Sequence, residues 1–529
     1  MKATYFLTTA IDYTNGVPHL GHAYEKVLTD VLARYHRLKG EDVFFLTGVD
    51  QHGQKVQQSA EKQGVPPQEF VNSITAQFRA LWEKLDVRYN QWAATTEERH
   101  KACVRAILQR LWDDVDPATG ASRWIYKDKR GGYYSVRQEQ FLTDKERGPD
   151  GQFGPEWGQV EFREEENYYF RLEGRKQWLL DLIDARSRAG TPLVVPEFRV
   201  AELRNAVERL AGDLCISRPK SRLEWGIELP FDAEYVTFVW FDALVNYISF
   251  APGYDPAVGA DLTEFRRWWP AVHIIGKDIL VPAHGVYWPI MLNALGFADD
   301  EIPTLLVHGW WGLAGAKMSK SEGNSVDPGA LADRYGTEAL RFYLMSDIAT
   351  GRDADFSEER LVQRYNSELA NNLGNLLNRT LSMTQKYRQG VLRAGELPGA
   401  DKLGTYETAM DEFDTQAGLA WIDHTATYCN ALIDTNAPWK LAKDPAQATQ
   451  LDQVLYSLCD HLRMIAVALF PFLPNAAHGI FDQLNWRMEK VGADDRFQLE
   501  DLRLGLLPDG HQINAPKPLF PRFETKPVG

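Results

Sequence analysis

The stretch Asn15–His22 constrains the fold of this chain more than any other part of the sequence, and it reads Asn-Gly-Val-Pro-His-Leu-Gly-His. It follows the short β-rich run Thr4–Thr9, and apolar residues then recur at helical spacing over Val27–Leu38 until Gly40. This order predicts a strand, a tight turn and a helix. Two imidazoles at the start of a helix lie where an anion can bind the backbone N–H groups and the positive end of the dipole. A nucleotide phosphate is the natural candidate.

A second motif, Ala316–Asn324, stands much later in the chain and reads Ala-Lys-Met-Ser-Lys-Ser-Glu-Gly-Asn. It follows the apolar run Thr304–His308, which predicts another strand. Two lysines flanked by Ser and Gly predict a basic loop, and an ammonium is a compact charge suited to a phosphate that must arrive and leave. Either motif alone is equally typical of a helix cap or a solvated turn. Together, in this order, they point to a nucleotide site.

The two motifs resemble the signatures of the class I aminoacyl-tRNA synthetases, a His-x-Gly-His near the N-terminus and a Lys-Met-Ser-Lys-Ser after the last core strand. The chain is most similar to the methionyl members of that family. This resemblance implies an ATP-dependent ligase that converts L-methionine to methionyl-adenylate and pyrophosphate. The enzyme would then transfer methionine to the 3′ end of tRNA(Met), initiator tRNA included.

The length of 529 residues predicts several domains, because it exceeds what one hydrophobic core supports. The expected fold class is α/β, a Rossmann-like doubly wound parallel sheet with an inserted connective domain, followed by an all-α helix-bundle anticodon-binding domain. We assign the apolar run Tyr235–Asp242 to a strand of the main sheet, and we expect Asp213–Arg218 to return the chain to that core. The expected parts are the first half of the sheet at 1–115, the connective insertion at 116–229, the second half at 230–325, a linker with the segment after the second motif at 326–360, and the helical domain at 361–529.

Ligands of open α/β sheets bind at the carboxyl ends of the strands, and both the His-x-Gly-His turn and Asp50 follow predicted strands. By resemblance, His19 and His22 contact the ATP phosphates, while Lys317 and Lys320 close on pyrophosphate in the transition state. The substrate carboxylate is already ionised, so donors rather than a nucleophile are expected. Mg²⁺ would bind the ATP phosphates and would need no dedicated set of protein ligands. The further expected ATP contacts are Gly21, Gly276, Asp278, Ser319 and Ser321.

The resemblance also implies a methionine pocket, in which Asp50 and the carbonyl of Ile11 take the ammonium group. A thioether is soft and unbranched, so aromatic faces can hold it by packing. Asp12 departs from the family pattern, since Pro or an apolar residue is expected there, and so does Leu244, where some relatives have Pro. The segment 281–289 is one residue longer than expected, which affects the placement of His284. The other expected pocket residues are Arg218, Tyr13, Trp240, Ala243, Tyr247, Ile279 and His284.

In the helical region, Asn371, Asn372 and Trp439 match positions that recognise the CAU anticodon in the family, where amides read base edges and an aromatic ring stacks on a base. The net charge of −15 argues against a general nucleic-acid binder, so any RNA site must be local. The basic stretch Arg360–Arg393 is a second candidate RNA site, although a solvated helix face is the ordinary explanation of such a stretch.

The four cysteines are far apart, which excludes an ordinary Cys-rich zinc knuckle and predicts buried free thiols, at Cys103, Cys215, Cys429 and Cys459. Many methionyl synthetases carry Cys knuckles in the connective insertion. Ser135 and Gln138 stand where such cysteines are expected, so we predict that the structural zinc has been lost.

The chain opens without the apolar length of a signal peptide, and no apolar run reaches the roughly 20 residues of a membrane span. We therefore expect a cytoplasmic protein with no membrane contact. No further module follows Pro518–Pro521, whereas some relatives carry a C-terminal dimerising domain, so a monomer is expected.

Three alternatives remain open at this point. Class I synthetases for Ile, Val and Leu carry a larger insertion than 116–229, and the cysteinyl enzyme uses a Cys-rich zinc site. A small nucleotidyltransferase would share the His-x-Gly-His motif without the helical region. An RNA-binding paralogue that has lost catalysis would not need both motifs intact.

Overall fold

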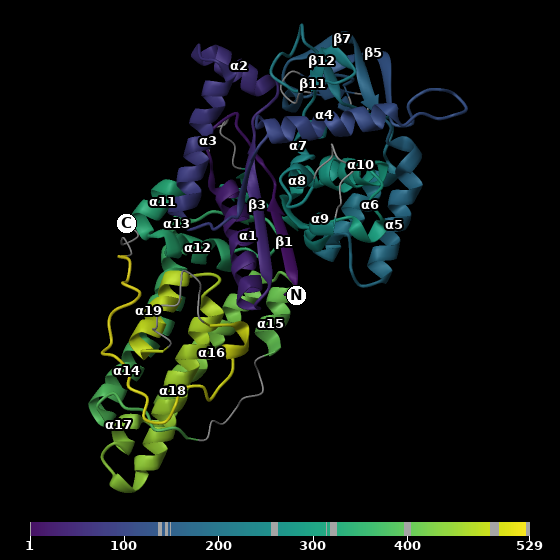
Figure 1. The fold of residues 1–529 in the computed structure, drawn as a ribbon. Helices are drawn as coiled ribbons and strands as arrows, with labels where there is room; N and C mark the ends of the chain where they lie inside the picture. The colour runs from purple at the N-terminus through teal and green to yellow at the C-terminus, as the bar shows by residue number, and fades with distance from the viewer. Residues whose placement is uncertain are drawn as a thin grey trace.

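The computed structural model describes residues 2–135, 140–142, 146–148, 150–254, 263–313, 315–317, 325–395, 404–486 and 497–524. Figure 1 shows a central sheet with its covering helices, a β-rich module at one end, and a helical bundle at the other end. The expected fold class is confirmed.

The central sheet is parallel throughout its described pairings, in the order β4-β3-β1-β13-β14-β8, with β2 pairing the end of β3. Neighbouring residues of one strand enter different cores, Phe6 on one face and Leu7 on the other. Both faces are therefore buried, which is why these strands are almost continuously apolar. The strands are β1 (Thr4–Thr9), β2 (Asp12–Tyr13), β3 (Asp42–Asp50), β4 (Gln91–Ala94), β8 (Val194–Val195), β13 (Val272–Gly276) and β14 (Thr304–His308).

The predicted strand, turn and helix at the N-terminus are confirmed. Helix α1 (Leu20–Leu38) begins directly after His19, and Gly40 follows it with φ of 84°, a left-handed conformation that glycine adopts without strain. The first half of the sheet is completed by α2 (Gln54–Gln63), α3 (Pro67–Lys84) and α4 (Glu98–Asp113).

The connective module consists of two small antiparallel sheets beside α4 (Figure 1). Our assignment of Tyr235–Asp242 to the main sheet was wrong, because the described partners of β12 are β10 and β11 and the strand ends at Thr237. Asp213–Arg218 likewise enters these small sheets rather than the core. An apolar run predicts a buried strand but does not specify its sheet. The strands are β5 (Ile125–Ser135), β6 (Gln140–Leu142), β7 (Val160–Phe170), β9 (Leu214–Cys215), β10 (Ser217–Pro219), β11 (Glu228–Leu229) and β12 (Asp232–Thr237).

The predicted insertion 116–229 is not one separate module. Its middle part forms α5 (Lys176–Arg188) and α6 (Val200–Glu208), and between them β8 adds to the edge of the main sheet beside β14. The segment thus leaves the sheet, returns to it, and leaves again.

The second half of the sheet carries four α-helices among the described residues, of which α7 (Trp240–Ala243) and α8 (Asn246–Ser249) contribute to one wall of the site. Residues 280–287 form an irregular helical segment that is kinked at Val281, where φ of −118° and ψ of 126° are not helical. The kink lies in the segment that is one residue longer than expected from the sequence. The other two α-helices are α9 (Thr263–Trp268) and α10 (Trp288–Ala294).

The expected linker 326–360 is structured. It contains α11 (Pro328–Tyr335), α12 (Thr337–Ser346) and β17 (Ala354–Asp355), which pairs with β15 (Trp311–Leu313). β15 also pairs with β16 (Ala316–Lys317), so the second motif begins on a strand.

The helical bundle shares one apolar core with α1 and α12, without a break between domains. Arg341 on α12 is fully buried at this junction, where it donates to Asp30 of α1 at 2.7 Å and to the carbonyl of Phe472 at 2.8 Å. Within the part of the chain that the structure describes, no helix combines the length and the apolar character needed to cross a bilayer. The bundle contains α13 (Glu358–Arg364), a π-helix at 365–374, α14 (Asn375–Arg388), α15 (Gly404–Asp411), α16 (Thr415–Asn436), α17 (Pro438–Leu441), α18 (Ala448–Leu469) and α19 (Pro474–Leu484).

Candidate active site

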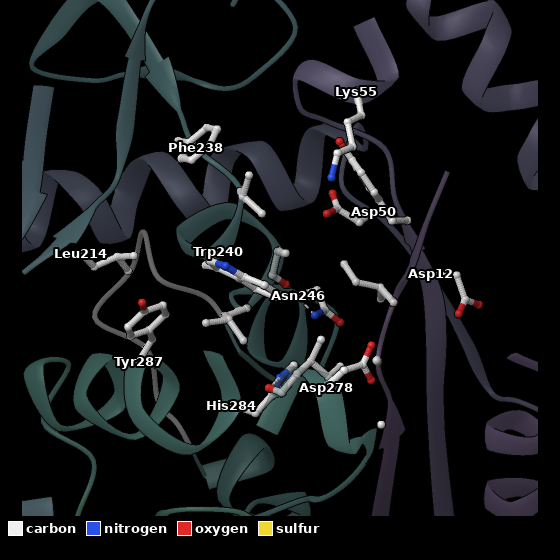
Figure 2. A pocket seen from close by; sticks show the side chains of 18 of the residues that line it. Asp12, Asp50, Lys55, Leu214, Phe238, Trp240, Asn246, Asp278, His284 and Tyr287 are labelled. Atoms are coloured by element: carbon white, nitrogen blue, oxygen red, sulfur yellow. Dashed lines mark hydrogen bonds between the residues drawn. The ribbon is translucent and has the colours of Figure 1, made fainter. Parts of the chain in front are cut away.

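A cavity of about 810 Å³ opens at the carboxyl ends of β1, β3, β13 and β14 (Figure 2). It lies where the strand order reverses between β1 and β13, the position at which open α/β sheets bind ligands. The structure brings together every predicted catalytic, ATP and methionine residue that it describes with its side chain: His19, Gly21, His22, Gly276, Asp278, Ile11, Tyr13, Asp50, Arg218, Trp240, Ala243, Tyr247, Ile279 and His284.

The His-x-Gly-His turn is fixed by its own histidines. Nδ1 of His19 accepts from the Gly21 N–H at 3.1 Å, and Nδ1 of His22 accepts from the His19 N–H at 3.1 Å. Each ring therefore carries its proton on Nε2. The two rings lie 3.9 Å apart between centroids and both line the cavity, so the motif presents two N–H donors at the N-terminus of α1.

Asp50 ends β3 and is buried, with the Thr95 hydroxyl donating to its Oδ1 at 3.4 Å. A carboxylate in this place can accept from an ammonium group. Figure 2 shows the side chain of Lys55, from the first turn of α2, directed towards Asp50. Sequence reasoning missed Lys55, although its place two residues after the turn Gly48–Gly53 is a usable signal.

The wall opposite Asp50 is buried and uncharged. Nδ1 of His284 donates to the Ile279 carbonyl at 2.9 Å, so Nε2 accepts from the Tyr247 hydroxyl at 2.7 Å. Burial lowers the pKa of His284 to about 4 and raises the pKa of Tyr247 well above its usual value. His273, stacked on Tyr247 at 4.1 Å, is also held neutral, because burial lowers its pKa far below the usual value. A neutral aromatic wall suits an apolar side chain.

Trp240 crosses the middle of the cavity in Figure 2, and it begins α7 rather than ending a core strand. The residue before it, Val239, has φ of 39°, which is unfavourable for a β-branched residue. Asp242 anchors α7 by accepting from His52 at 2.7 Å and from His100 at 2.8 Å. Burial alone would raise the pKa of Asp242, but the two imidazoles outweigh burial and hold it far below its usual value.

The predicted ribose contacts lie at the end of β13. A Cβ on Gly276 would lie 2.7 Å from Oδ1 of Asp278, so a larger residue here would displace the Asp278 carboxylate. Asp278 accepts from Nε1 of Trp310 at 3.2 Å, and Trp310 follows β14. Trp310 and His308 line the cavity but were missed, because nothing in an apolar strand end marks them.

Arg218 is fully buried beside the cavity, with its guanidinium 3.5 Å above the ring of Phe238. Its Nη1 donates to Sγ of Cys215 at 3.0 Å. Cys215 lines the cavity and is only partly buried, so our expectation of a buried thiol was wrong for this residue. Cys103, Cys429 and Cys459 are buried as expected.

Several predictions fall outside what the structure describes. Lys320, Ser319, Ser321 and Gln138 lie outside the described residues, and only the backbone of Lys317 is described, in β16. Ser135 is buried, and its hydroxyl donates to the carbonyl of Trp157. No group of three or more potential metal ligands lies together among the described residues.

The predicted anticodon residues lie in the helical bundle, and none of them lines the cavity. Trp439 is 41% exposed on α17, at the end of the bundle remote from the sheet (Figure 1). Asn371 is exposed. The Asn372 amide instead packs its helix on α16, donating to Asp423 at 2.7 Å and to Thr427 at 2.9 Å.

The stretch Arg360–Arg393 does not form the basic surface that we considered. Its guanidinium groups pair with carboxylates that are distant in sequence or on a neighbouring turn, so little unbalanced positive charge remains. The pairs are Arg360 with Asp347, Arg364 with Asp347 and Glu368, Arg379 with Asp434, Arg388 with Asp452, and Arg393 with Asp509.

Comparison with known proteins extends these observations. A family model described as tRNA synthetases class I (M) matches residues 5–151 and 157–381, and a model of the anticodon binding domain of methionyl tRNA ligase matches residues 397–527. The methionine–tRNA ligases of Lactococcus lactis and Bacillus subtilis are 37% and 38% identical to the chain. Each of these matches covers 99% of this chain and 78% of the relative.

Solved structures agree with the sequence relatives. Mycobacterium tuberculosis methionyl-tRNA synthetase in complex with methionyl-adenylate matches with a TM-score of 0.86 at 34% identity, covering 99% of this chain and 100% of that one. Its apo form matches with a TM-score of 0.82 at 31% identity, covering 99% of each chain.

Proposed function

The chain belongs to the methionyl class I tRNA synthetases, and from that premise we propose how its own residues divide the work of the reaction. It is a ligase that activates methionine with ATP and transfers the methionyl group to tRNA. The matches to both the catalytic and the anticodon-binding parts contradict the alternatives of a different class I synthetase, a small nucleotidyltransferase and a non-catalytic RNA-binding paralogue.

In the activation step, a methionine carboxylate oxygen attacks the α-phosphorus of ATP and pyrophosphate leaves. His19 and His22 donate from Nε2 to the phosphates, while Gly276 and Asp278 hold the ribose. Lys317 and Lys320, with Ser319 and Ser321, close on the leaving pyrophosphate. Charge on the phosphates rises as the bond to pyrophosphate breaks, so these donors act most strongly in the transition state.

Methionine is selected by two unlike walls of one cavity. Asp50 and the carbonyl of Ile11 take the ammonium group, and Arg218 lies on the connective side of the same ligand. Facing them is the uncharged wall that includes Trp240 and His284. The observation that carries this proposal is the convergence of a carboxylate, two imidazole donors and a neutral aromatic wall at four strand ends. The remaining wall residues are Tyr13, Ala243, Tyr247 and Ile279.

In the transfer step, a ribose hydroxyl at the 3′ end of tRNA attacks the methionyl carbonyl and AMP leaves. We assign recognition of the CAU anticodon, in tRNA(Met) and initiator tRNA alike, to Trp439, Asn371 and Asn372. Asn372 would have to exchange its bonds to α16 for bonds to a base, so Trp439 and Asn371 contribute more. The exposed Trp439 ring supports this assignment, because bases of a loop can stack on it.

Mg²⁺ would arrive with ATP and be held chiefly by the phosphates, as its chemistry favours. Asp278 is a carboxylate within the same cavity, but its bond to Trp310 directs it to the ribose. The proposed enzyme acts in the cytoplasm, in keeping with its substrates methionine, ATP and tRNA, and we propose that it acts as a monomer.

Exchange of pyrophosphate into ATP, measured with each of the twenty amino acids in turn, tests this function. Methionine alone should support rapid exchange. Equal or faster exchange with isoleucine, valine or cysteine would contradict the assignment of the pocket.

A further inference from the structure

A buried ion cluster lies beneath the His-x-Gly-His turn. Lys26 of α1 is 0% exposed, and its ammonium donates to Asp12 at 2.7 Å, to Glu25 at 2.9 Å and to the carbonyl of Ala10 at 3.1 Å. Asp12 and Glu25 are also buried. Asp12 is the residue at which the sequence departs from the expected Pro or apolar residue, so its partner Lys26 accounts for that departure.

The cluster favours the charged forms of Lys26 and Glu25. Burial alone would lower the pKa of Lys26, but Asp12 and Glu25 outweigh burial and raise it above the usual value. Burial alone would raise the pKa of Glu25, but Lys26 and His308 hold it below the usual value. Buried ion pairs are often no more stable than apolar residues of the same shape, so fold stability alone is a weak explanation for this cluster.

The cluster touches both halves of the active site. Ala10 and Asp12 flank Ile11, whose carbonyl we assign to the methionine ammonium group. Asp12 lines the cavity, and Figure 2 shows its carboxylate on the opposite side of its strand from Trp240 and Asp50. Oδ1 of Asp12 lies 4.0 Å from Nε2 of His22, the donor that we assign to the phosphates.

The second carboxylate reaches the nucleotide side of the cavity. Oε2 of Glu25 lies 3.0 Å from Nε2 of His308, at the end of β14. A Cβ on Gly276 would lie 3.6 Å from Cε1 of His308, which places that ring beside the proposed ribose site. Lys26 is not among the described residues that line the cavity, so it can act only through its partners.

We propose that Lys26 is a positioning residue that holds the methionine-binding strand end and the ATP-binding turn in one register. Asp12 and the Ala10 carbonyl connect it to the methionine half, and Glu25 connects it to the nucleotide half through His308. The proposal rests on the proposed function, because it assumes that both substrates occupy this cavity. Loss of Lys26 should therefore weaken the binding of both methionine and ATP, although Lys26 contacts neither substrate.

The test uses the full chain and pyrophosphate exchange with methionine and ATP. Lys26→Met alone would leave two buried carboxylates without a cation and can fail to fold. The main variant is therefore the triple change Asp12→Asn, Glu25→Gln and Lys26→Met, which keeps the shapes and removes all three charges. We expect it to melt within a few degrees of the wild type, while the KM values for methionine and ATP both rise about tenfold or more.

Glu25→Gln alone provides the matched comparison, because it leaves Lys26 balanced by Asp12 and removes the carboxylate charge that faces Lys26 and His308. We expect it to raise the KM for ATP and to leave the KM for methionine within about twofold. A folded triple variant with both KM values within twofold of the wild type would overturn the proposal. So would a Glu25→Gln variant in which both KM values change equally or neither changes. Failure of the proposed function can be distinguished from failure of the Lys26 proposal. If the proposed function is wrong, the wild type itself will show no methionine-dependent exchange.

Discussion

Trp240 is the residue on which methionine binding should depend most directly. Its ring crosses the cavity, so Trp240→Ala removes packing worth on the order of 2–4 kcal/mol to the bound thioether, on the scale of core truncations. We expect the KM for methionine in pyrophosphate exchange to rise at least tenfold. Trp268→Ala is the matched control, because that ring is also half-buried but lies on α9 outside the cavity lining. Equal effects of the two changes on the KM for methionine would show that Trp240 serves packing only.

His284 makes a prediction about pH. Its pKa is about 4 in the folded protein and close to 6.5 when exposed, so between these values only the unfolded state gains the proton. The neutral ring therefore contributes full stability above pH 6.5, and that contribution falls by about 1.4 kcal/mol per pH unit towards pH 4. Urea unfolding from pH 7 to pH 4.5 should show a shallower loss of stability in His284→Gln than in the wild type. Parallel curves would contradict the buried neutral ring.

That His19, His22 and Asp50 lie together could be predicted from sequence, because an open α/β sheet binds its ligands at the carboxyl ends of its strands. Lys26 and His308 could not be predicted. Each lies in a segment that reads as ordinary apolar helix or strand, and each acquires its role only through a partner brought near by the fold. Lys317 remains a prediction.

At the scale of elements, Arg341 joins the helical bundle to the sheet. It bonds Asp30 on α1 and the carbonyl of Phe472, and it is fully buried. Arg341→Met should destabilise the protein by roughly 3–5 kcal/mol, because it breaks a buried ion pair. Arg334→Met is the control, since that guanidinium is mostly exposed and pairs with Glu358 on the surface. A surface pair contributes under about 1 kcal/mol. Urea midpoints that shift equally would contradict this account of the junction.

The elements also show which features of the fold could not be predicted from the sequence. Helix α1 follows its apolar periodicity and was predicted from the sequence. β8 has two residues and pairs with β14, so no periodic pattern could reveal that the chain returns to the sheet. β12 was recognised as a strand but placed in the wrong sheet, because pairing is decided by tertiary contacts rather than by local composition.

At the scale of the whole molecule, charge balance depends on folding. The basic stretch 360–393 is a candidate RNA-binding surface in the sequence, because most of the carboxylates that pair with its arginines are distant along the chain. Asp434, Asp452 and Asp509 neutralise Arg379, Arg388 and Arg393 only once the bundle is assembled. Our proposal of an RNA-binding end therefore rests on the exposed aromatic ring of Trp439 rather than on net charge.

Metal content gives a prediction for the intact protein. Ser135 and Gln138 replace expected cysteines in the connective module, and a hydroxyl or an amide is a poor ligand for zinc in place of a thiolate. The purified protein should contain no stoichiometric zinc, and prolonged chelation should leave its melting temperature unchanged. Elemental analysis that finds one tightly held Zn²⁺ per chain would contradict this prediction.

The central claim is that one end of the molecule activates methionine while the other end reads tRNA. The most direct test compares tRNA charging with pyrophosphate exchange in Trp439→Ala, since exchange requires no tRNA. Stacking on a base is worth roughly 1–3 kcal/mol, so charging should fall about tenfold or more while methionine-dependent exchange keeps the wild-type rate. If exchange falls as much as charging, Trp439 supports the fold or the active site, and the division of labour between the two ends is wrong.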